Sequence, residues 1–213
     1  MERRKRIGFM VTVIALAMAF SQALPAAAAT KFGSRLNTTI QPSNAGQGRW
    51  CDEFTSGEED PPHPTCTWIL NEAYVHSATI DPRAHARAPR DGYVDKVKVI
   101  SCGPGSFRLQ IAKVKRAVHQ AKVVRQSGVL SYAGDPDHCD DETYTVNTIN
   151  LSPNLRVYKG QFLAVRAKQI GFLRCSSGGD NTLIFDPYLP VGGSYEDEST
   201  DDGCWMLLEA VMA

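Results

Sequence analysis

Six cysteines are the residues of this 213-residue sequence whose chemistry is easiest to predict. They are widely spaced and form no Cys-x-x-Cys pair, so a zinc centre is disfavoured. An even number of cysteines in an exported chain indicates disulfides instead. The sequence alone leaves the pairing open, because six cysteines can pair in many ways. We expect nearest neighbours to bond, which gives Cys51–Cys66, Cys102–Cys139 and Cys175–Cys204.

A run of acidic residues offers the best candidate metal site. Carboxylates suit Ca²⁺, which prefers oxygen ligands from acidic loops. The spacing departs from a calcium-binding Asp-x-Asp-x-Asp-Gly loop, because Cys139 stands at the third position. A solvated loop is the competing interpretation. We expect no cofactor other than a structural calcium ion, for which the candidate ligands are Asp135, Asp137, Asp140 and Asp141.

Aromatic residues near expected loops are candidates for binding a sugar. A ring face can stack on the apolar face of a pyranose while polar neighbours fix its orientation. Trp68 and Trp205 fall in expected strands and are assigned to the core. For Trp50, packing against the neighbouring disulfide is the competing interpretation. The candidate ligand-binding residues are Trp50, Tyr132, Tyr188 and Tyr195.

Motifs of common catalytic sites are missing from the sequence. The run Gly192–Gly193–Ser194–Tyr195 lacks the last glycine of the Gly-x-Ser-x-Gly turn of serine hydrolases. The five histidines are scattered and form no His-Glu-x-x-His pair, so hydrogen-bonded surface histidines are favoured over metal ligands. We therefore expect no catalytic residues and no enzymatic activity.

The first residues, 1–29, are typical of a secretory signal peptide. Four basic residues precede an apolar stretch that ends near Phe20, and small residues at 26–29 offer a cleavage site. The apolar stretch is shorter than the roughly 20 residues of a membrane-spanning helix. We expect a secreted, extracellular protein with no membrane span after cleavage.

Removing this leader leaves 19 basic and 22 acidic residues, a net charge of −3. A chain so close to neutral has no overall attraction for nucleic acid or for anionic membranes. Nucleic acid is therefore not expected as a partner, although a local basic patch stays compatible with this composition.

The elements that must position these residues are mostly strands. Alternation of Phe107, Leu109 and Ile111 with Arg108 and Gln110 has the period of two that is typical of a strand with one buried face. The turn at 103–106 predicts a hairpin between this strand and residues 92–102. Other expected strands are 66–70, 122–132, 144–151, 162–167, 182–185 and 204–211, and one helical turn fits within 112–121.

Counting these strands predicts an all-β, antiparallel two-sheet β-sandwich of jelly-roll type. Residues 66–213 form the expected sandwich domain. Residues 30–65 lack sustained periodicity and are expected to be an N-terminal arm and loop that is tethered by a disulfide. Residues 36–40 are the candidate for one added edge strand.

Three segments carry a resemblance to a known group of proteins. They are Ala88–Val94, Phe107–Ile111 and Val157–Val165, which read APRDGYV, FRLQI and VYKGQFLAV. In these segments the chain resembles secreted actinobacterial β-sandwich proteins of unassigned function, which are similar to jelly-roll carbohydrate-binding modules. The resemblance implies the fold and brings no active site with it.

Together these patterns favour a secreted, non-catalytic binding or structural module, with a cell-surface or extracellular glycan as the expected partner. Two other functions remain open at this stage. One is a secreted hydrolase on the same fold, and the other is a protein-binding or inhibitor module.

The cysteine pattern yields a direct test. Thiol titration of the denatured, unreduced protein should find no free thiol, because all six cysteines are expected to be oxidised. Reduction before titration provides the positive control. A pair of titratable thiols in the unreduced sample would contradict the three-disulfide framework.

Overall fold

The computed structural model describes residues 29–42, 48–55, 63–138, 144–175 and 178–213. These residues form antiparallel strands with only short helical segments, which confirms the predicted all-β fold. In these described ranges there are two α-helices, α1 (Cys51–Thr55) and α2 (Pro82–His85), together with 3-10 turns at Arg116–Val118 and Pro136–His138. Within the described ranges, no helix has the length and apolar character needed to cross a membrane.

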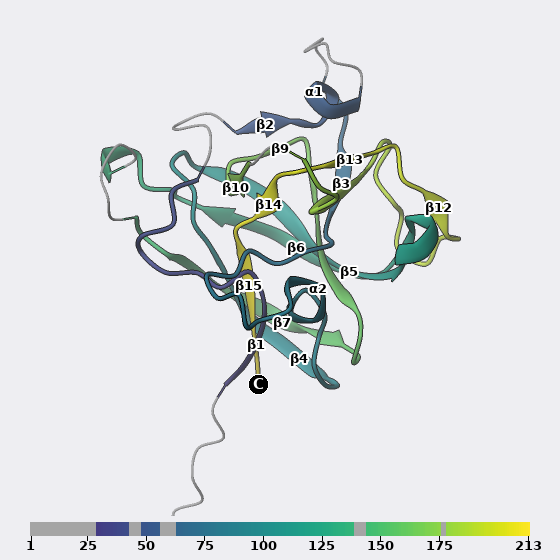
Figure 1. Ribbon diagram of the computed structural model, residues 1–213, viewed down its shortest axis with the longest axis horizontal. Coiled ribbons are helices and arrows are strands. Elements are labelled where there is room, and N and C mark those ends of the chain that lie inside the picture. Colours follow the sequence, from purple (N-terminus) through teal and green to yellow (C-terminus); the bar gives the residue numbers. More distant parts are fainter. Residues whose placement is uncertain (1–28, 43–47, 56–62, 139–143, 176–177) are drawn as a thin grey trace, which may run out of the picture.

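Two large sheets make up the body of the molecule (Figure 1). The four-stranded sheet has, in spatial order, β1 (Thr30–Gly33), β15 (Leu208–Met212), β4 (Gly92–Val99) and β7 (Asn147–Val157). The seven-stranded sheet has β12 (Glu196–Asp197), β6 (Gln120–Tyr132), β5 (Gly105–Lys115), β8 (Phe162–Ala167), β3 (Cys66–Leu70), β11 (Thr182–Phe185) and β13 (Thr200–Asp202).

The order of the eight principal strands is that of a jelly roll. In chain order these eight strands are β1, β3, β4, β5, β6, β7, β8 and β15. The smaller sheet contains the first, eighth, third and sixth of them, side by side in that order. The second, seventh, fourth and fifth lie side by side in the other. This arrangement is the double Greek key expected from the sequence. Strands β11 and β13 extend one edge of the larger sheet, and β12 extends the opposite edge.

Two short ribbons complete the structure. One pairs β2 (Arg49–Trp50) with β9 (Gln169–Ile170), and the other pairs β10 (Leu173–Arg174) with β14 (Trp205–Met206). In Figure 1, β2 and α1 lie at the top of the molecule beside β9, whereas β1, β4 and β7 lie at the lower end.

The inner strands of the larger sheet are buried on both faces. Every residue of β3 and β11 is buried, and so is all of β8 except Arg166. Largely apolar runs such as Cys66–Leu70 are typical of strands covered on both sides. Their bounds match the predicted strands because such runs are interrupted sharply by polar residues.

The N-terminal arm belongs to the sandwich, which corrects the predicted boundary at residue 66. Residues 30–33 form β1, which pairs with β15 at the edge of the smaller sheet. Phe32 and Ile40 are buried in the common core. Residues 36–40 are not a strand, and a turn lies there instead. Two buried side chains, Phe32 and Ile40, anchor the arm, and residues so few and so far apart give no periodic pattern in the sequence.

The predicted hairpin across residues 103–106 is also wrong. Strand β4 pairs with β15 and β7, whereas β5 pairs with β6 and β8. The turn therefore carries the chain from one sheet to the other. Alternation reveals which face of a strand is buried, but it does not identify the partner strand.

The predicted face of β5 is correct for its apolar residues and wrong for Gln110. Phe107, Leu109 and Ile111 are buried as expected, and Gln110 is fully buried as well. Its side-chain amide accepts a hydrogen bond from Thr67 Oγ1 at 3.0 Å and donates to Leu189 O at 3.3 Å. The chain after β11 covers this outer face of the sheet, so Gln110 is shielded from water and satisfied by protein groups.

Two of the predicted disulfides are present, Cys51–Cys66 and Cys175–Cys204. Cys102 is also disulfide-bonded, and its expected partner Cys139 lies outside the described residues.

The burial of Phe32 tests whether the arm is part of the fold. Phe32→Ala should lower the free energy of unfolding by about 3–5 kcal/mol, the usual cost of truncating a buried phenylalanine. Urea denaturation of the protein measures this loss. The matched control is Thr38→Ala in the same arm, whose side chain is exposed and should change stability by less than about 0.5 kcal/mol. Equal stabilities of the two variants would mean that β1 does not anchor the arm.

Candidate functional site

A cavity of about 420 Å³ opens where the β2–β9 ribbon meets the turn between β4 and β5. Its volume falls within the range of small-ligand sites, roughly 300–1,000 Å³. The wall includes Trp50 and Gln169 from the ribbon, Ser106 from β5 and Tyr132 at the end of β6. The remaining lining residues are Gly48, Gly103, Pro104, Gly105, Lys168 and Gly171.

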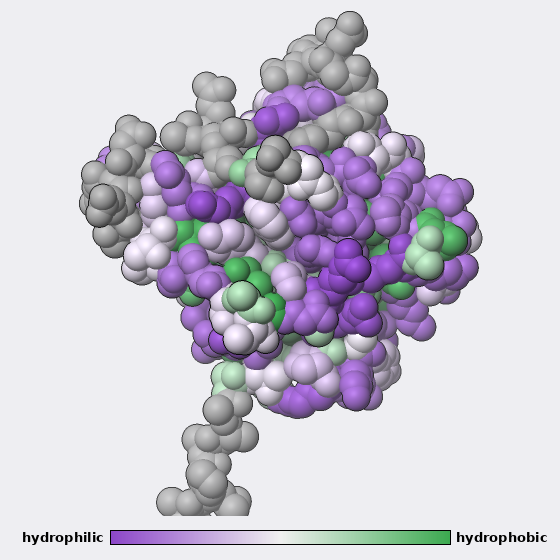
Figure 2. Space-filling model, viewed as in Figure 1, coloured by the Kyte–Doolittle hydropathy of each residue, from purple (hydrophilic) through white to green (hydrophobic). Residues whose placement is uncertain are grey.

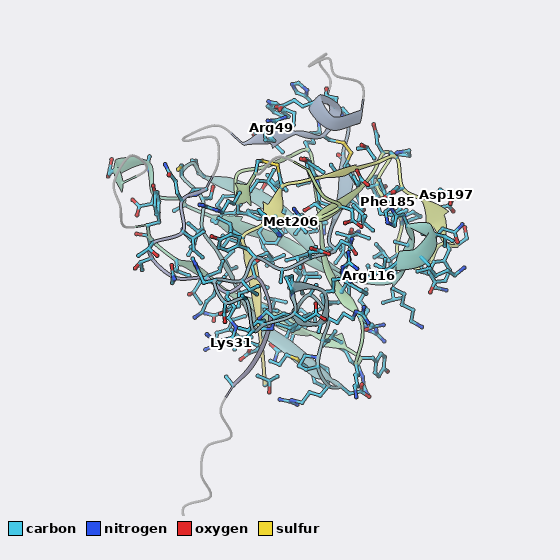
Figure 3. The ribbon with its side chains drawn as sticks, viewed as in Figure 1. Lys31, Arg49, Arg116, Phe185, Asp197 and Met206 are labelled. Atoms are coloured by element: carbon cyan, nitrogen blue, oxygen red, sulfur yellow. A yellow bond between two sulfur atoms is a disulfide. The ribbon has the colours of Figure 1, made fainter. Side chains whose placement is uncertain are left out.

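Trp50 is held in this wall by the polar residues around helix α1. Its backbone N–H donates to Glu53 Oε1 at 3.0 Å, and Glu53 also pairs with Arg49, which extends from β2 (Figure 3). The indole stacks on the His63 ring with centroids 3.8 Å apart. This stacking occupies one face of the indole, and Trp50 is half-buried where it lines the cavity.

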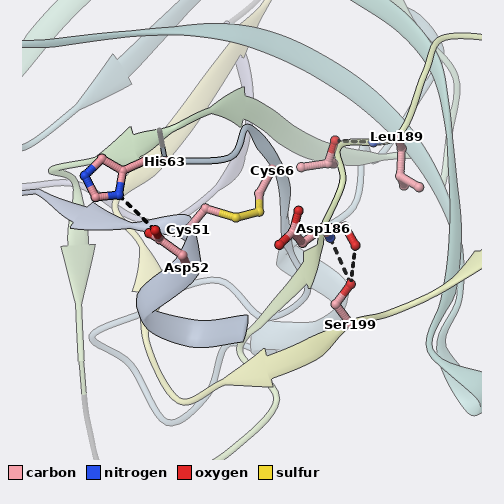
Figure 4. Close-up of a disulfide and its surroundings, with 8 residues drawn as sticks. Cys51, Asp52, His63, Cys66, Asp186, Leu189 and Ser199 are labelled. Carbon is pink, nitrogen blue, oxygen red and sulfur yellow. Dashed lines mark hydrogen bonds and ion pairs between the residues drawn. A yellow bond between two sulfur atoms is a disulfide. The ribbon is translucent and has the colours of Figure 1, made fainter. Parts of the chain in front are cut away.

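The disulfide Cys51–Cys66 fastens this segment to β3 (Figure 4). Beside it, His63 Nδ1 lies 2.9 Å from Asp52 Oδ2, an interaction that fixes the imidazole on which Trp50 stacks. The backbone N–H of Cys51 donates to Lys168 O at 3.0 Å. The disulfide and these hydrogen bonds therefore set where Trp50 lies relative to Lys168 and Gln169.

Tyr132 contributes its hydroxyl to the cavity, and its ring belongs to the core. The ring packs against Phe107 and Phe172, with centroids 6.1 and 5.5 Å away. The hydroxyl accepts a hydrogen bond from the backbone N–H of Gly171 at 3.2 Å. Burial raises the pKa of this phenol, and the Gly171 N–H partly opposes the rise. The predicted stacking role is wrong for Tyr132, because its ring is buried.

The cavity thus combines one aromatic ring with groups that hydrogen-bond. An indole offers an apolar face, and the amide of Gln169 and the hydroxyl of Ser106 offer donors and acceptors. Gln169 Nε2 donates to Gly48 O at 2.9 Å, which orients the amide within the wall. Such a combination suits a small polar ligand that also has an apolar face.

The other two predicted aromatic residues lie elsewhere. Tyr188 stacks under the Arg166 guanidinium, whose carbon is 3.3 Å from the ring centroid. Tyr195 lies beneath the ammonium groups of Lys115 and Lys122, at 4.2 and 4.9 Å. Neither tyrosine lines the cavity around Trp50.

The candidate calcium ligands are not brought together as far as the structure describes them. Asp135 accepts a hydrogen bond from the Thr145 backbone at 3.1 Å, and Asp137 is exposed in a 3-10 turn. Asp140 and Asp141 lie outside the described residues. The groupings of potential ligands found within the described ranges include neither Asp135 nor Asp137.

Sequence reasoning did not single out one polar cluster, around His119. This residue has a left-handed backbone with φ of 45°. Its Nδ1 pairs with Glu198, and its Nε2 lies 3.4 Å from Asp180 Oδ2. With Asp201, His119 and Glu198 place potential ligand atoms within 4.8 Å of one another, close enough for a divalent ion. Direct contacts of the imidazole with two carboxylates also account for this geometry, because both ring nitrogens face an acid.

Glu198 is partly buried, and the pKa of its carboxyl is raised above the usual value. Desolvation raises the pKa of Glu198, whereas its hydrogen bond to His119 lowers it. His119 and Asp180 are distant in sequence from Glu198 and Asp201, and the pairing of β11 with β13 and of β12 with β6 brings the three segments together. A single sequence offers no signal for such a cluster.

No protein family model matches this chain, and comparisons with curated proteins and with solved structures found no match. Its function must therefore be argued from the chemistry of the site.

Gly105 allows the floor of the cavity to form, because it lies directly across from Tyr132 in the β5–β6 ladder. A Cβ atom at Gly105 would lie 2.2 Å from the Tyr132 hydroxyl oxygen, far inside contact distance. Gly105→Ala should therefore displace the phenol and lower the free energy of unfolding by about 1–3 kcal/mol. Gly128→Ala on β6 is the control, since its Cβ would meet nothing within 4 Å. Thermal unfolding compares the two, and equal midpoints would contradict the close contact at Gly105.

Proposed function

We propose that this protein is a secreted, non-catalytic module that binds a glycan in the cavity of Trp50 and Gln169. The observation that carries the proposal is the placement of one indole beside hydrogen-bonding groups in a cavity of about 420 Å³. A pyranose has an apolar face for the ring and hydroxyl groups for the amide and hydroxyl side chains. The jelly-roll topology, which the sequence resemblance also implied, supports the same function by analogy only.

The binding surface is preorganised, which favours recognition of a small ligand. Trp50 is restrained by its stacking on His63 and by the neighbouring disulfide. Gln169 is restrained by its hydrogen bond to Gly48. Side chains that are already ordered lose little further entropy when a ligand binds.

The surface also favours a small ligand over a large protein partner. The face seen in Figure 2 is mostly hydrophilic, and its hydrophobic areas are small and separated. Broad apolar patches are the usual mark of a protein-binding face. The five large hydrophobic side chains that are exposed within the described residues come from different strands and loops, and they are Tyr93, Val118, Val129, Tyr158 and Val191.

Screening the mature protein on a glycan array, followed by calorimetric titration with the best glycan, tests the proposal. Trp50→Ala should lower the affinity about tenfold or more, as expected when a central tryptophan of a binding site is removed. The control is Trp205→Phe, because Trp205 packs on Tyr74 with ring centroids 5.6 Å apart and does not line the cavity. It should leave the affinity unchanged.

Two results would reject this proposal. Equal binding by the Trp50→Ala variant and the wild type would remove the cavity from the binding site. Release of new reducing ends from the bound glycan would instead reveal the hydrolase that the sequence left open.

A further inference from the structure

A second hollow lies beside the cavity, over β5 and β8 of the larger sheet. This hollow has a volume of about 230 Å³ and shares Ser106 and Lys168 with the first. Its other lining residues are Thr65, Phe107, Arg108, Val129, Arg166 and Ala167. A ligand seated beside Trp50 can therefore extend over β5 and β8 without leaving the surface of the protein.

Two arginines face each other in this second hollow. Arg108 on β5 and Arg166 on β8 are direct partners in the antiparallel ladder, so their side chains extend from the same face of the sheet. Like charges directly opposite one another destabilise a sheet. Both residues line the hollow, and Lys168 adds a third positive charge at its junction with the first cavity.

No acidic partner offsets these charges within the described part of the chain. None of its ion pairs includes Arg108, Arg166 or Lys168. Arg108 donates one long hydrogen bond of 3.4 Å to Ser127 O, and Arg166 stacks on Tyr188. A guanidinium carries five N–H donors, so most donors of this pair are left for water or a ligand.

We propose that the second hollow is a subsite for an oxyanion, and hence that the bound glycan is acidic, carrying carboxylate or sulfate groups. This inference rests on the proposed function. Guanidinium groups bind such oxyanions through paired, charge-assisted hydrogen bonds. A bound anion would also remove the repulsion between the two arginines, and the stacking of Arg166 on Tyr188 holds one guanidinium in place for it.

Matched oligosaccharides test the charge requirement. The mature protein is titrated with an oligogalacturonate and with its methyl ester, which keeps the sugar backbone and removes the charges. A sulfated oligosaccharide of similar length forms a second acidic arm. We expect at least one of the acidic ligands to bind about tenfold or more tightly than the neutral ester, with an affinity that falls as salt is added. The acidic oligosaccharide that binds more tightly shows whether the subsite prefers a carboxylate or a sulfate group.

Charge-matched double variants test the assigned residues. Arg108→Gln with Arg166→Gln should abolish the preference for the acidic ligand over the neutral ester. The control is Arg125→Gln with Arg156→Gln, which also removes two arginines stacked on tyrosine, at Tyr158 and Tyr93. It should keep the preference. Loss of the preference in both double variants would assign it to net charge and overturn the subsite.

The remaining outcomes separate this inference from the proposed function. Equal binding of acidic and neutral oligosaccharides, both weakened by Trp50→Ala, would overturn the oxyanion subsite and leave glycan binding intact. Polyglutamate tests for charge without sugar, and we expect it to bind weakly. If polyglutamate binds as tightly as the acidic glycan and Trp50→Ala has no effect, both the glycan and the acidic-glycan assignments fail.

Discussion

The disulfide between Cys51 and Cys66 is the constraint on which the candidate site depends. Strand β2 has two residues and pairs only with the two residues of β9. A ribbon of this size has little stability of its own. The disulfide joins it to β3, an inner strand of the larger sheet, across a sequence separation of 15 residues. In the chain-entropy description, closing such a loop stabilises the folded state by about 3 kcal/mol. Trp50 therefore takes its position from the sheet core.

Burial along a strand could be predicted from the sequence, whereas contacts between distant segments could not. Strands β3, β8 and β11 match their predicted bounds because their apolar runs reflect burial on both faces. The partner of each strand was harder to predict, because pairing in a jelly roll is decided by contacts between distant segments. The turn before β5 has the residues of a hairpin, yet it crosses between sheets. Gln110 has the pattern of an exposed residue, yet the segment that ends at Leu189 covers it.

The candidate site was only partly predictable for a similar reason. Trp50 is a candidate because it is an aromatic residue near an expected loop, and it does line the main cavity. Tyr188 and Tyr195 fitted the same rule, but both rings are engaged by cationic side chains. No motif in the sequence marks Gln169 or Arg166 as a binding residue. They become candidates because strand pairing places Gln169 opposite Trp50 and Arg166 opposite Arg108. Composition identifies residues that can bind, and topology decides which of them meet.

Charge illustrates this difference most clearly. The chain is close to neutral overall, yet its charges are separated in space. Acids gather around His119 near β12 and β13, whereas Arg108 and Arg166 stand opposite each other on β5 and β8. Electrostatic interactions are screened over about 8 Å at physiological ionic strength, so a ligand responds to the local group and not to the net charge. The three cations that line the second hollow are too few to follow the backbone of a nucleic acid, whose binding usually needs many phosphate contacts. Their close spacing suits one discrete anionic group, which the adjoining hydrogen-bonding cavity would hold as part of a larger polar ligand.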